Sequence, residues 1–341
     1  MLLIQDAVSK VLSGMPFVVP WLRRWAGAEF LCVNYHLVSD RPNPLLGDGF
    51  PRLTVKAFER DLDWLLKHYR PLSLRDVIRS IDNTGQLPAR GFVVTFDDGH
   101  AECHDLAAPV LSRKGVPAAF FLCTATLDNR EMIYEHKKNI ILAALKDGPD
   151  PQAARQALAS LPGLGSAAGS VEEAIRAVDY PQRHLLDAAA QRLQVDMAGY
   201  LKAQRPYLSE GQVRALMKAG FEIGSHGIDH AWIAVLDPAE QIRHIVDSTR
   251  HLRELFELDY GLFAFPFSEE GVPDRIIRAA LDSGLVDLVM GTRNGARDEI
   301  PRCVQRTGAD IKRGATPTRF LKIYHDMILD RRRGRGVVVR A

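Results

Sequence analysis

The sequence predicts an α/β protein whose buried parallel strands form either a barrel or a doubly wound sheet. Two observations predict this class. Six short runs of apolar, β-branched and aromatic residues recur along the chain, and longer segments with the apolar spacing of helices separate several of them. Buried strands that alternate with amphipathic helices are typical of parallel βα units.

Each strand-like run has the length of a single strand, and each helical segment shows apolar residues at helical spacing. The predicted strands are Phe30–Tyr35, Gly91–Phe96, Ala118–Cys123, Phe221–Ser225, Leu262–Phe265 and Val286–Met290. The predicted helices between them are Val55–Tyr69, Glu102–Arg113, Glu210–Ala219, Pro238–Phe256 and Pro273–Ser283.

One stretch, residues 129–204, breaks this alternation. It is helical in pattern, contains no strand-like run, and is interrupted by a segment rich in Gly, Pro, Ser and Ala at 148–169. We therefore predict a helical insertion over one end of the sheet. The core domain is predicted at 30–315, including this insertion.

Both ends of the chain are predicted to lie outside the core. In residues 1–29, apolar side chains recur at helical spacing. This pattern predicts a helix region that docks on the core. Residues 316–341 form a C-terminal helix and a basic tail, with the arginine-rich part after Asp330 expected to be solvated. A peripheral membrane contact of these segments is the alternative to docking.

The composition excludes several classes of protein. The 341 residues are 46% hydrophobic and 25% charged, which rules out disorder, collagen and a disulfide scaffold. The 44 Lys+Arg residues nearly balance the 42 Asp+Glu residues. A net charge this small gives no electrostatic reason to expect nucleic acid as a partner.

Cysteine usage and the N-terminal residues predict a cytoplasmic protein. The four cysteines lie far apart and form no C-x-x-C pair, so neither a zinc ribbon nor a redox motif is indicated. No apolar run approaches the ~20 residues that span a bilayer. Asp6 and Lys10 interrupt the stretch that a signal peptide would need to be apolar.

Two acidic residues follow the strand at 91–96. In the segment Val93–His100 an apolar run is followed by Asp97, Asp98 and a glycine. These residues lie at the strand end where βα folds place their sites. Adjacent side chains at a strand end point in different directions. One carboxylate can therefore bind a metal while the other stays free as a base.

Two histidines follow the strand at 221–225. His226 and His230 are four residues apart, which places both imidazoles on one face of a helical turn. Gly227 stands where the zinc-protease pattern needs glutamate. Two histidines and one carboxylate leave a fourth position for water, as in catalytic zinc sites that lower the pKa of water to about 7. The residues therefore indicate metal-assisted hydrolysis.

Together these pieces resemble the polysaccharide deacetylase family, also called the NodB-homology or carbohydrate esterase four family. Thr95–Gly99 is similar to its first motif, Ser225–His230 to its metal motif, and Phe263–Ser268 to its third motif. The resemblance runs from about Phe30 to Arg302 and leaves the insertion and the tail unexplained. It implies a distorted (β/α) barrel of about seven strands, with the site at the C-terminal rim.

The resemblance also implies roles for single residues. Asp98, His226 and His230 would bind one divalent ion, with zinc first and cobalt or nickel as alternatives. Asp97 would be the general base. The backbone N–H of Phe267 would hold the oxyanion.

The general acid needs a separate argument because no late L-x-H motif is present. Some family members are circularly permuted and carry this histidine in an early Tyr-His segment, which Tyr35-His36 resembles. His36 is therefore the predicted acid, and His325, in a helical pattern, is its rival.

Three positions depart from the family pattern. Gly227 replaces a hydroxyl residue of the metal motif, and Ser268 stands where glycine is usual. Ala264 replaces the arginine that holds the base in many members.

The predicted activity is metal-dependent hydrolysis of N-acetyl groups from an amino-sugar-containing glycan or glycoconjugate. One alternative is a catalytically decayed glycan-binding protein on the same scaffold, motivated by Gly227 and Ser268. Another is a related metal hydrolase that acts on ester, formyl or cyclic amide bonds. The sugar, its carrier and the oligomeric state do not follow from the sequence.

Overall fold

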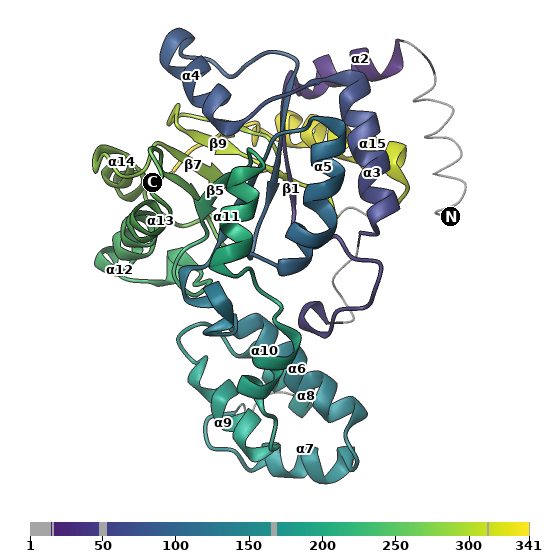
Figure 1. The fold of residues 1–341 in the computed structure, drawn as a ribbon, viewed down its shortest axis with the longest axis vertical. Coiled ribbons are helices and arrows are strands. Elements are labelled where there is room, and N and C mark those ends of the chain that lie inside the picture. The colour runs from purple at the N-terminus through teal and green to yellow at the C-terminus, as the bar shows by residue number, and fades with distance from the viewer. Residues whose placement is uncertain (1–14, 16, 48–52, 165–168, 312–313, 341) are drawn as a thin grey trace.

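The computed structural model describes residues 15, 17–47, 53–164, 169–311 and 314–340. A barrel-like sheet surrounded by helices forms one part of the molecule, and a lobe of helices extends from one end of it (Figure 1). In the described part of the chain, no helix is both long and apolar enough to cross a membrane.

The central sheet is parallel throughout and follows the order β10-β1-β3-β4-β5-β6-β7-β9. Its strands are β1 (Phe30–Tyr35), β3 (Gly91–Phe96), β4 (Ala118–Leu122), β5 (Glu222–Ser225), β6 (Leu262–Ala264), β7 (Leu288–Gly291), β9 (Cys303–Gln305) and β10 (Thr307–Gly308). The short β2 (Arg70–Pro71) pairs with β3 at its start.

The two ends of this sheet meet in one segment of the chain. Only Arg306 separates β9 from β10, while β9 pairs with β7 and β10 pairs with β1. Residues 303–308 therefore close the sheet into a distorted barrel. The predicted α/β class and distorted barrel are confirmed, and the doubly wound alternative is excluded.

The register of the strands brings the predicted motifs to one rim. Tyr35 pairs with Phe96, the last residues of β1 and β3, and Leu122 pairs with Ser225, the last residues of β4 and β5. Because parallel strands end at the same edge, the residues that follow them gather there.

Helices cover the outside of the barrel (Figure 1). They are α3 (Val55–His68), α5 (Ala108–Lys114), α11 (Glu210–Lys218), α12 (Pro238–Ile242), α13 (Ser248–Phe256) and α14 (Asp274–Asp282). Helix α4 (Leu74–Thr84) instead packs against the residues inside the barrel. Sequence patterns missed α4, although Ser73 and Asp76 form a capping box at its start. The predicted helices at 102–113 and 238–256 each contain a π-helical turn, at Cys103–Ala107 and Arg243–Asp247.

Alternate strand residues form an apolar cluster inside the barrel. It contains Cys32, Val93, Ala119, Phe121, Leu262, Ala264, Leu288, Met290 and Val304, together with Leu74, Val77 and Ile81 of α4. Since side chains alternate between the two faces of a strand, Asn34, Thr95 and Asp97 continue this inner face toward the rim. The barrel interior therefore changes from apolar to polar where the site lies.

The lobe lies between β4 and α11, and its described residues form five helices. They are α6 (Tyr134–Asp147), α7 (Pro151–Ala159), α8 (Val171–Ala177), α9 (His184–Arg192) and α10 (Met197–Gln204). A 3₁₀ turn at Thr124–Asn129 leads into the lobe. Asn129 and Tyr207 exchange two hydrogen bonds, of 3.0 and 2.9 Å, so the chain enters and leaves the lobe at one point.

The first and last of the described helices pack beside each other on the barrel. Helix α2 (Val18–Ala26) lies against α15 (Thr316–Arg332), with Val19, Arg23 and Ala26 buried. Residues 1–14, which carry part of the predicted docking pattern, lie outside the described residues.

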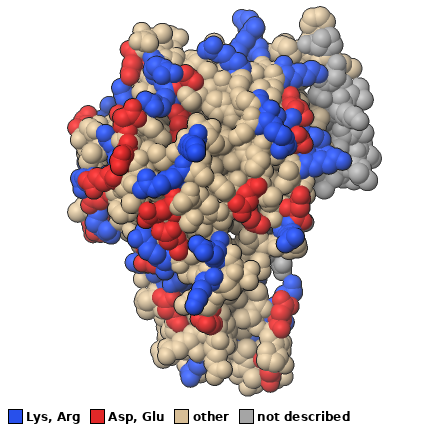
Figure 2. All heavy atoms as spheres, viewed as in Figure 1, with Lys and Arg blue, Asp and Glu red and all other residues tan. Residues whose placement is uncertain are grey.

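The arginine-rich tail is less solvated than its composition predicts. Strand β11 (Val337–Val338) pairs with β8 (Arg297–Asp298). The buried Arg340 guanidinium donates two hydrogen bonds, of 2.6 and 2.7 Å, to the Asp298 carboxylate. Elsewhere acidic and basic side chains are intermixed over the visible surface, in line with the small net charge (Figure 2).

Candidate metal centre and active site

The loops after β3 and β5 bring one carboxylate and two histidines together at the barrel rim. His226 Nε2 lies 3.5 Å and His230 Nε2 lies 3.2 Å from Asp98 Oδ1. All three side chains are buried. Asp98 and His230 adopt left-handed backbone angles, with φ of 69° and 65°, which turn these side chains away from the ideal strand and helix directions.

The hydrogen bonds of His226 are consistent with a cation between the three side chains. Its Nδ1 lies 2.9 Å from the Ala264 carbonyl oxygen, which can only accept, so this nitrogen carries the proton. Burial lowers the pKa of His226 to about 4, so the ring is neutral at pH 7. Its unprotonated Nε2 therefore faces Asp98 Oδ1, which is buried and accepts no hydrogen bond from the described residues.

The distances also fit a metal ion. Ligand atoms about 2.0–2.2 Å from a tetrahedral zinc lie roughly 3.3–3.5 Å from one another. The two histidine distances to Asp98, 3.2 and 3.5 Å, are close to this range. Asp98, His226 and His230 thus have the chemistry and the spacing to bind a divalent ion.

Asp97 points to a different set of partners. Its Oδ1 accepts a 2.7 Å hydrogen bond from Arg306 Nη1, and its Oδ2 accepts a 2.9 Å bond from Asn34. Burial raises the pKa of Asp97, but the Arg306 guanidinium, with His226 and His36, more than offsets this and holds the pKa below its usual value. Asp97 is therefore an ionised carboxylate in a fixed orientation.

Arg306 holds Asp97, and this is the contact that the family pattern assigns to an arginine at position 264, where this chain has alanine. Arg306 is 1% exposed and lies between β9 and β10, so the closing segment of the barrel delivers its guanidinium to Asp97. Sequence reasoning missed Arg306 because it did not recognise residues 303–308 as strands.

His36 follows β1 and is held by Asp310. Its Nδ1 lies 3.1 Å from Asp310 Oδ2, and its backbone N–H donates to the same oxygen at 2.6 Å. Burial lowers the pKa of His36, but the Asp310 carboxylate, with Asp98 and Asp97, more than offsets this and raises the pKa to about 9. His36 is therefore protonated at neutral pH and can donate a proton.

The loop after β6 presents Phe267 to the same cavity. Its φ of 56° is left-handed, and its ring meets the His230 ring edge-on with centroids 4.6 Å apart. In the part of the chain that the structure describes, no acceptor pairs with the Phe267 backbone N–H. That N–H is available to a bound molecule.

A cavity of about 660 Å³ joins the predicted site residues. The barrel contributes Asn34, His36, Asp97, Asp98, His226, His230, Phe267 and Arg306, and the lobe contributes Ile133, Glu135, His136 and Asn139. The rival acid, His325, lies on the exposed surface of α15 and does not line this cavity.

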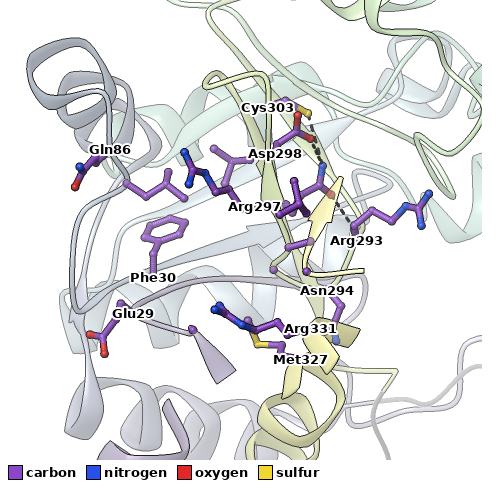
Figure 3. Close-up of a pocket in the computed structure, with 18 of the residues that line it drawn as sticks. Glu29, Phe30, Gln86, Arg293, Asn294, Arg297, Asp298, Cys303, Met327 and Arg331 are labelled. Atoms are coloured by element: carbon purple, nitrogen blue, oxygen red, sulfur yellow. Dashed lines mark hydrogen bonds between the residues drawn. The ribbon is translucent and has the colours of Figure 1, made fainter. Parts of the chain in front are cut away.

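A larger cavity, of about 800 Å³, lies apart from this chemistry. Figure 3 shows Glu29 and Phe30 on one side of it and Asn294, Met327 and Arg331 on the other. It contains none of the predicted site residues. We therefore place the candidate active site in the smaller cavity.

The fold and the site define a class of protein: a (β/α) barrel with an Asp-His-His cluster that can hold a metal at its C-terminal rim, next to an ionised carboxylate and a protonated histidine. A sequence profile of the polysaccharide deacetylase family matches residues 84–160 and 177–286. The chain belongs to this family.

Solved structures confirm the fold. The Streptococcus pyogenes deacetylase PplD, in complex with acetate, aligns over 86% of this chain and 97% of its own, with 14% identity and a TM-score of 0.54. IcaB from Ammonifex degensii aligns over 87% and 97%, with 15% identity and a TM-score of 0.50. A de-N-acetylase from Aggregatibacter actinomycetemcomitans aligns over 86% and 99%, with 15% identity and a TM-score of 0.50. No curated protein matches significantly.

Proposed function

We propose that this chain is a metal-dependent carbohydrate N-deacetylase that removes acetyl groups from an amino-sugar-containing glycan or glycoconjugate. One observation carries the proposal: an ionised Asp97 and a protonated His36 line the same cavity as the Asp98, His226 and His230 cluster. Amide hydrolysis needs both a base and an acid, because water must lose a proton and the departing amine must gain one.

Asp98, His226 and His230 would hold one divalent ion, with zinc preferred and cobalt or nickel as alternatives. When bound, such an ion polarises the amide carbonyl and lowers the pKa of water. Asp97 accepts the proton of the attacking water, while Arg306 and Asn34 keep its carboxylate oriented.

Two further groups complete the reaction. The Phe267 N–H hydrogen-bonds the oxygen that becomes negative in the tetrahedral adduct. His36, held in its charged form by Asp310, then protonates the departing amine. Acetate and a free amino sugar are released.

An acid directly after β1, ahead of the aspartate motif in the chain, would correspond to the circularly permuted arrangement of the family. The position of His36 in the cavity and its contact with Asp310 support this assignment. A His36→Gln variant is expected to lose activity, whereas His325→Gln is expected to retain it. The reverse result would return the acid role to His325.

The main test is acetate release from N-acetylated oligosaccharides by the metal-loaded protein. We expect Asp97→Asn to reduce kcat about 10²–10⁴-fold, as for the loss of a general base, while metal content stays unchanged. Loss of metal from this variant would show that the roles of the two aspartates are exchanged. Formylated and O-acetylated sugars in the same assay test the alternative bond types.

The second candidate function is a glycan-binding protein that has lost its catalytic activity, and Gly227 is the main observation that suggests it. Gly227 has a φ of 81°, a left-handed angle that strains any side chain, and its N–H donates to Ser225 Oγ. The glycine therefore suits this loop. Binding of an acetylated glycan without acetate release, after metal loading, would favour the decayed protein.

We also propose that α2 contacts an anionic membrane surface. Phe17, Trp21 and Trp25 recur every four residues and are 82%, 53% and 51% exposed. The Trp21 and Trp25 rings stack, and the Arg332 guanidinium lies 5.7 Å from the Trp25 ring. Exposed tryptophans beside arginines match an interface of anionic headgroups and acyl chains.

Vesicle cosedimentation tests this contact. The protein is expected to sediment with vesicles that contain phosphatidylglycerol and far less with pure phosphatidylcholine. The double variant Trp21→Ala/Trp25→Ala should lose this binding, while Trp232→Ala, at an equally exposed tryptophan elsewhere, should keep it. A concentration-dependent dimer that the double variant abolishes, without vesicle binding, would assign the surface to a second copy.

The proposed compartment is the cytoplasm. All four cysteines are buried and free, which suits a reducing environment. Fractionation of cells that express the untagged chain would test this, and recovery from the extracellular fraction would contradict it.

A further inference from the structure

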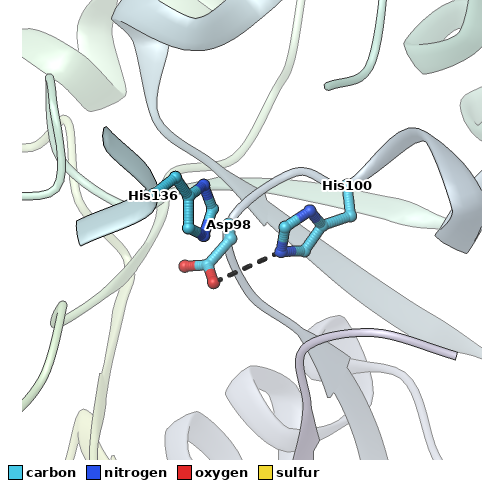
Figure 4. Close-up of side chains that lie close together, drawn as sticks. All are labelled: Asp98, His100 and His136. Atoms are coloured by element: carbon cyan, nitrogen blue, oxygen red, sulfur yellow. Dashed lines mark ion pairs between the residues drawn. The ribbon is translucent and has the colours of Figure 1, made fainter. Parts of the chain in front are cut away.

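Two buried histidines lie beside Asp98 and belong to none of the family-like motifs. His100 comes from the loop after β3 and is 1% exposed, and His136 comes from α6 of the lobe and is 5% exposed. Figure 4 shows the two rings near the Asp98 carboxylate, each with a nitrogen toward it. One ligand atom from each of the three residues lies within 4.8 Å of the others.

Neither ring nitrogen of His100 is hydrogen-bonded within the described residues, and both are buried. Its Nε2 lies 3.6 Å from Asp98 Oδ2, too long for a hydrogen bond but close to the spacing of two ligands on one ion. A buried polar group without a partner costs free energy, and an ion is one way in which such a group is satisfied.

His136 is held in place through its other nitrogen. Its Nδ1 lies 2.6 Å from the Tyr207 hydroxyl, which also accepts the Ile133 backbone N–H. Because Nδ1 is engaged there, the nitrogen that faces Asp98 is Nε2. Metal-binding histidines are commonly oriented by such a contact at the second ring nitrogen.

The two oxygens of Asp98 face different histidines. Oδ1 faces His226 and His230, whereas Oδ2 faces His100. A carboxylate in this position can bridge two cations, one on each oxygen, as in the two-metal sites of other hydrolases.

We propose that Asp98, His100 and His136 form a second divalent-cation site that shares Asp98 with the first. Two imidazoles and a carboxylate suit zinc, cobalt or nickel, with water completing the coordination. Since His136 lies on α6 and His100 on the barrel, the ion would also fasten the helical lobe to the barrel. The proposal does not depend on the bond that the enzyme hydrolyses.

Metal stoichiometry tests the second site. The purified chain is stripped with a chelator and titrated with zinc by calorimetry, and bound metal is counted by elemental analysis. We expect two ions per chain in the wild type and one in His100→Ala and in His136→Gln. His251→Ala, which removes an exposed histidine far from the cavity, is the control and should keep two.

A second readout separates binding from misfolding. Far-UV circular dichroism checks that each variant is folded, and the zinc-induced rise in Tm is measured for each. Removal of the second site should leave a smaller rise, because stabilisation by a ligand grows with its binding. Cobalt absorption should likewise show two binding phases in the wild type and one in His136→Gln.

The outcomes are distinct. One ion per chain in the wild type, unchanged in folded His100→Ala and His136→Gln, would overturn the proposal and leave these histidines as buried neighbours of Asp98 that bind no ion. That result would leave the proposed deacetylation intact. Two ions without acetate release would instead support the second site and contradict the proposed function.

Discussion

The two histidine pairs around Asp98 reach it by different routes. His226 and His230 lie on one loop, four residues apart, directly after β5. His100 and His136 come from separate elements, and the second belongs to the helical lobe. A pair on one loop leaves a local pattern in the sequence, whereas a pair assembled by docking of a lobe leaves none.

The pairs also differ in what orients them. The Ala264 carbonyl of the barrel fixes the His226 ring, while the Tyr207 hydroxyl, at the end of the lobe, holds His136. The first contact depends on the sheet alone. The second depends on how the lobe sits on the barrel, so the two sides of Asp98 should respond differently to substitutions.

The largest effect is expected from Asp98→Asn, because both sides share this residue. An amide does not supply the negative charge, so we expect loss of all bound metal and of acetate release. Elemental analysis checks the metal. Asp97→Asn is the control and should keep its metal, and retention of one ion by Asp98→Asn would contradict the shared role.

The next largest effect is expected on stability, from a substitution of Arg306 in the barrel. Arg306→Met leaves the buried Asp97 carboxylate without its counter-charge, which should destabilise the fold by about 3–5 kcal/mol. Urea unfolding measures this. Arg302→Met, which breaks an exposed ion pair with Asp82, should cost less than about 1 kcal/mol. Equal effects would show that Arg306 does not balance Asp97.

A smaller effect is expected from Asp310→Asn, which removes the carboxylate that raises the pKa of His36. In the wild type the protonated acid is lost as the pH rises through about 9, so activity should fall there. Without Asp310, only Asp98 and Asp97 oppose the effect of burial on the pKa of His36, so the alkaline limb of kcat/KM should move to lower pH. An unchanged alkaline limb of the kcat/KM profile would show that His36 is not the proton donor.

The same contact predicts how stability depends on pH. Because the folded pKa of His36 lies above its ordinary value of 6.5, its contribution is complete below about pH 6.5 and is lost as the pH rises toward 9. The free energy of unfolding should fall over this window, and Asp310→Asn should flatten the decline.

The smallest effect is expected on the lobe side. Tyr207→Phe removes the hydroxyl that orients His136 and should weaken the second cation about 10–100-fold while sparing the first. Zinc titration measures both. Equal weakening of the two phases would show that the two sides of Asp98 are not independent.

Short sequence patterns by themselves determined most strands of the barrel and the positions of four candidate site residues. Buried strands at 30–35 and 91–96 follow from continuous apolar runs, and Asp97, Asp98, His226 and His230 lie at strand ends or at helical spacing. Each of these signals is contained within about ten residues. The barrel class, and the grouping of Asp98, His226 and His230 at one rim, could therefore be predicted.

Tertiary structure alone decided the partners of these residues. Gln305 ends β9 and Arg306 links it to β10, and both are polar, so the segment that closes the barrel lacks the apolar run of a buried strand. Asp310 meets His36 from 274 positions away, and His136 meets Asp98 only because the lobe returns at Tyr207. Contacts between distant segments depend on how the chain closes and packs, and no local pattern encodes them.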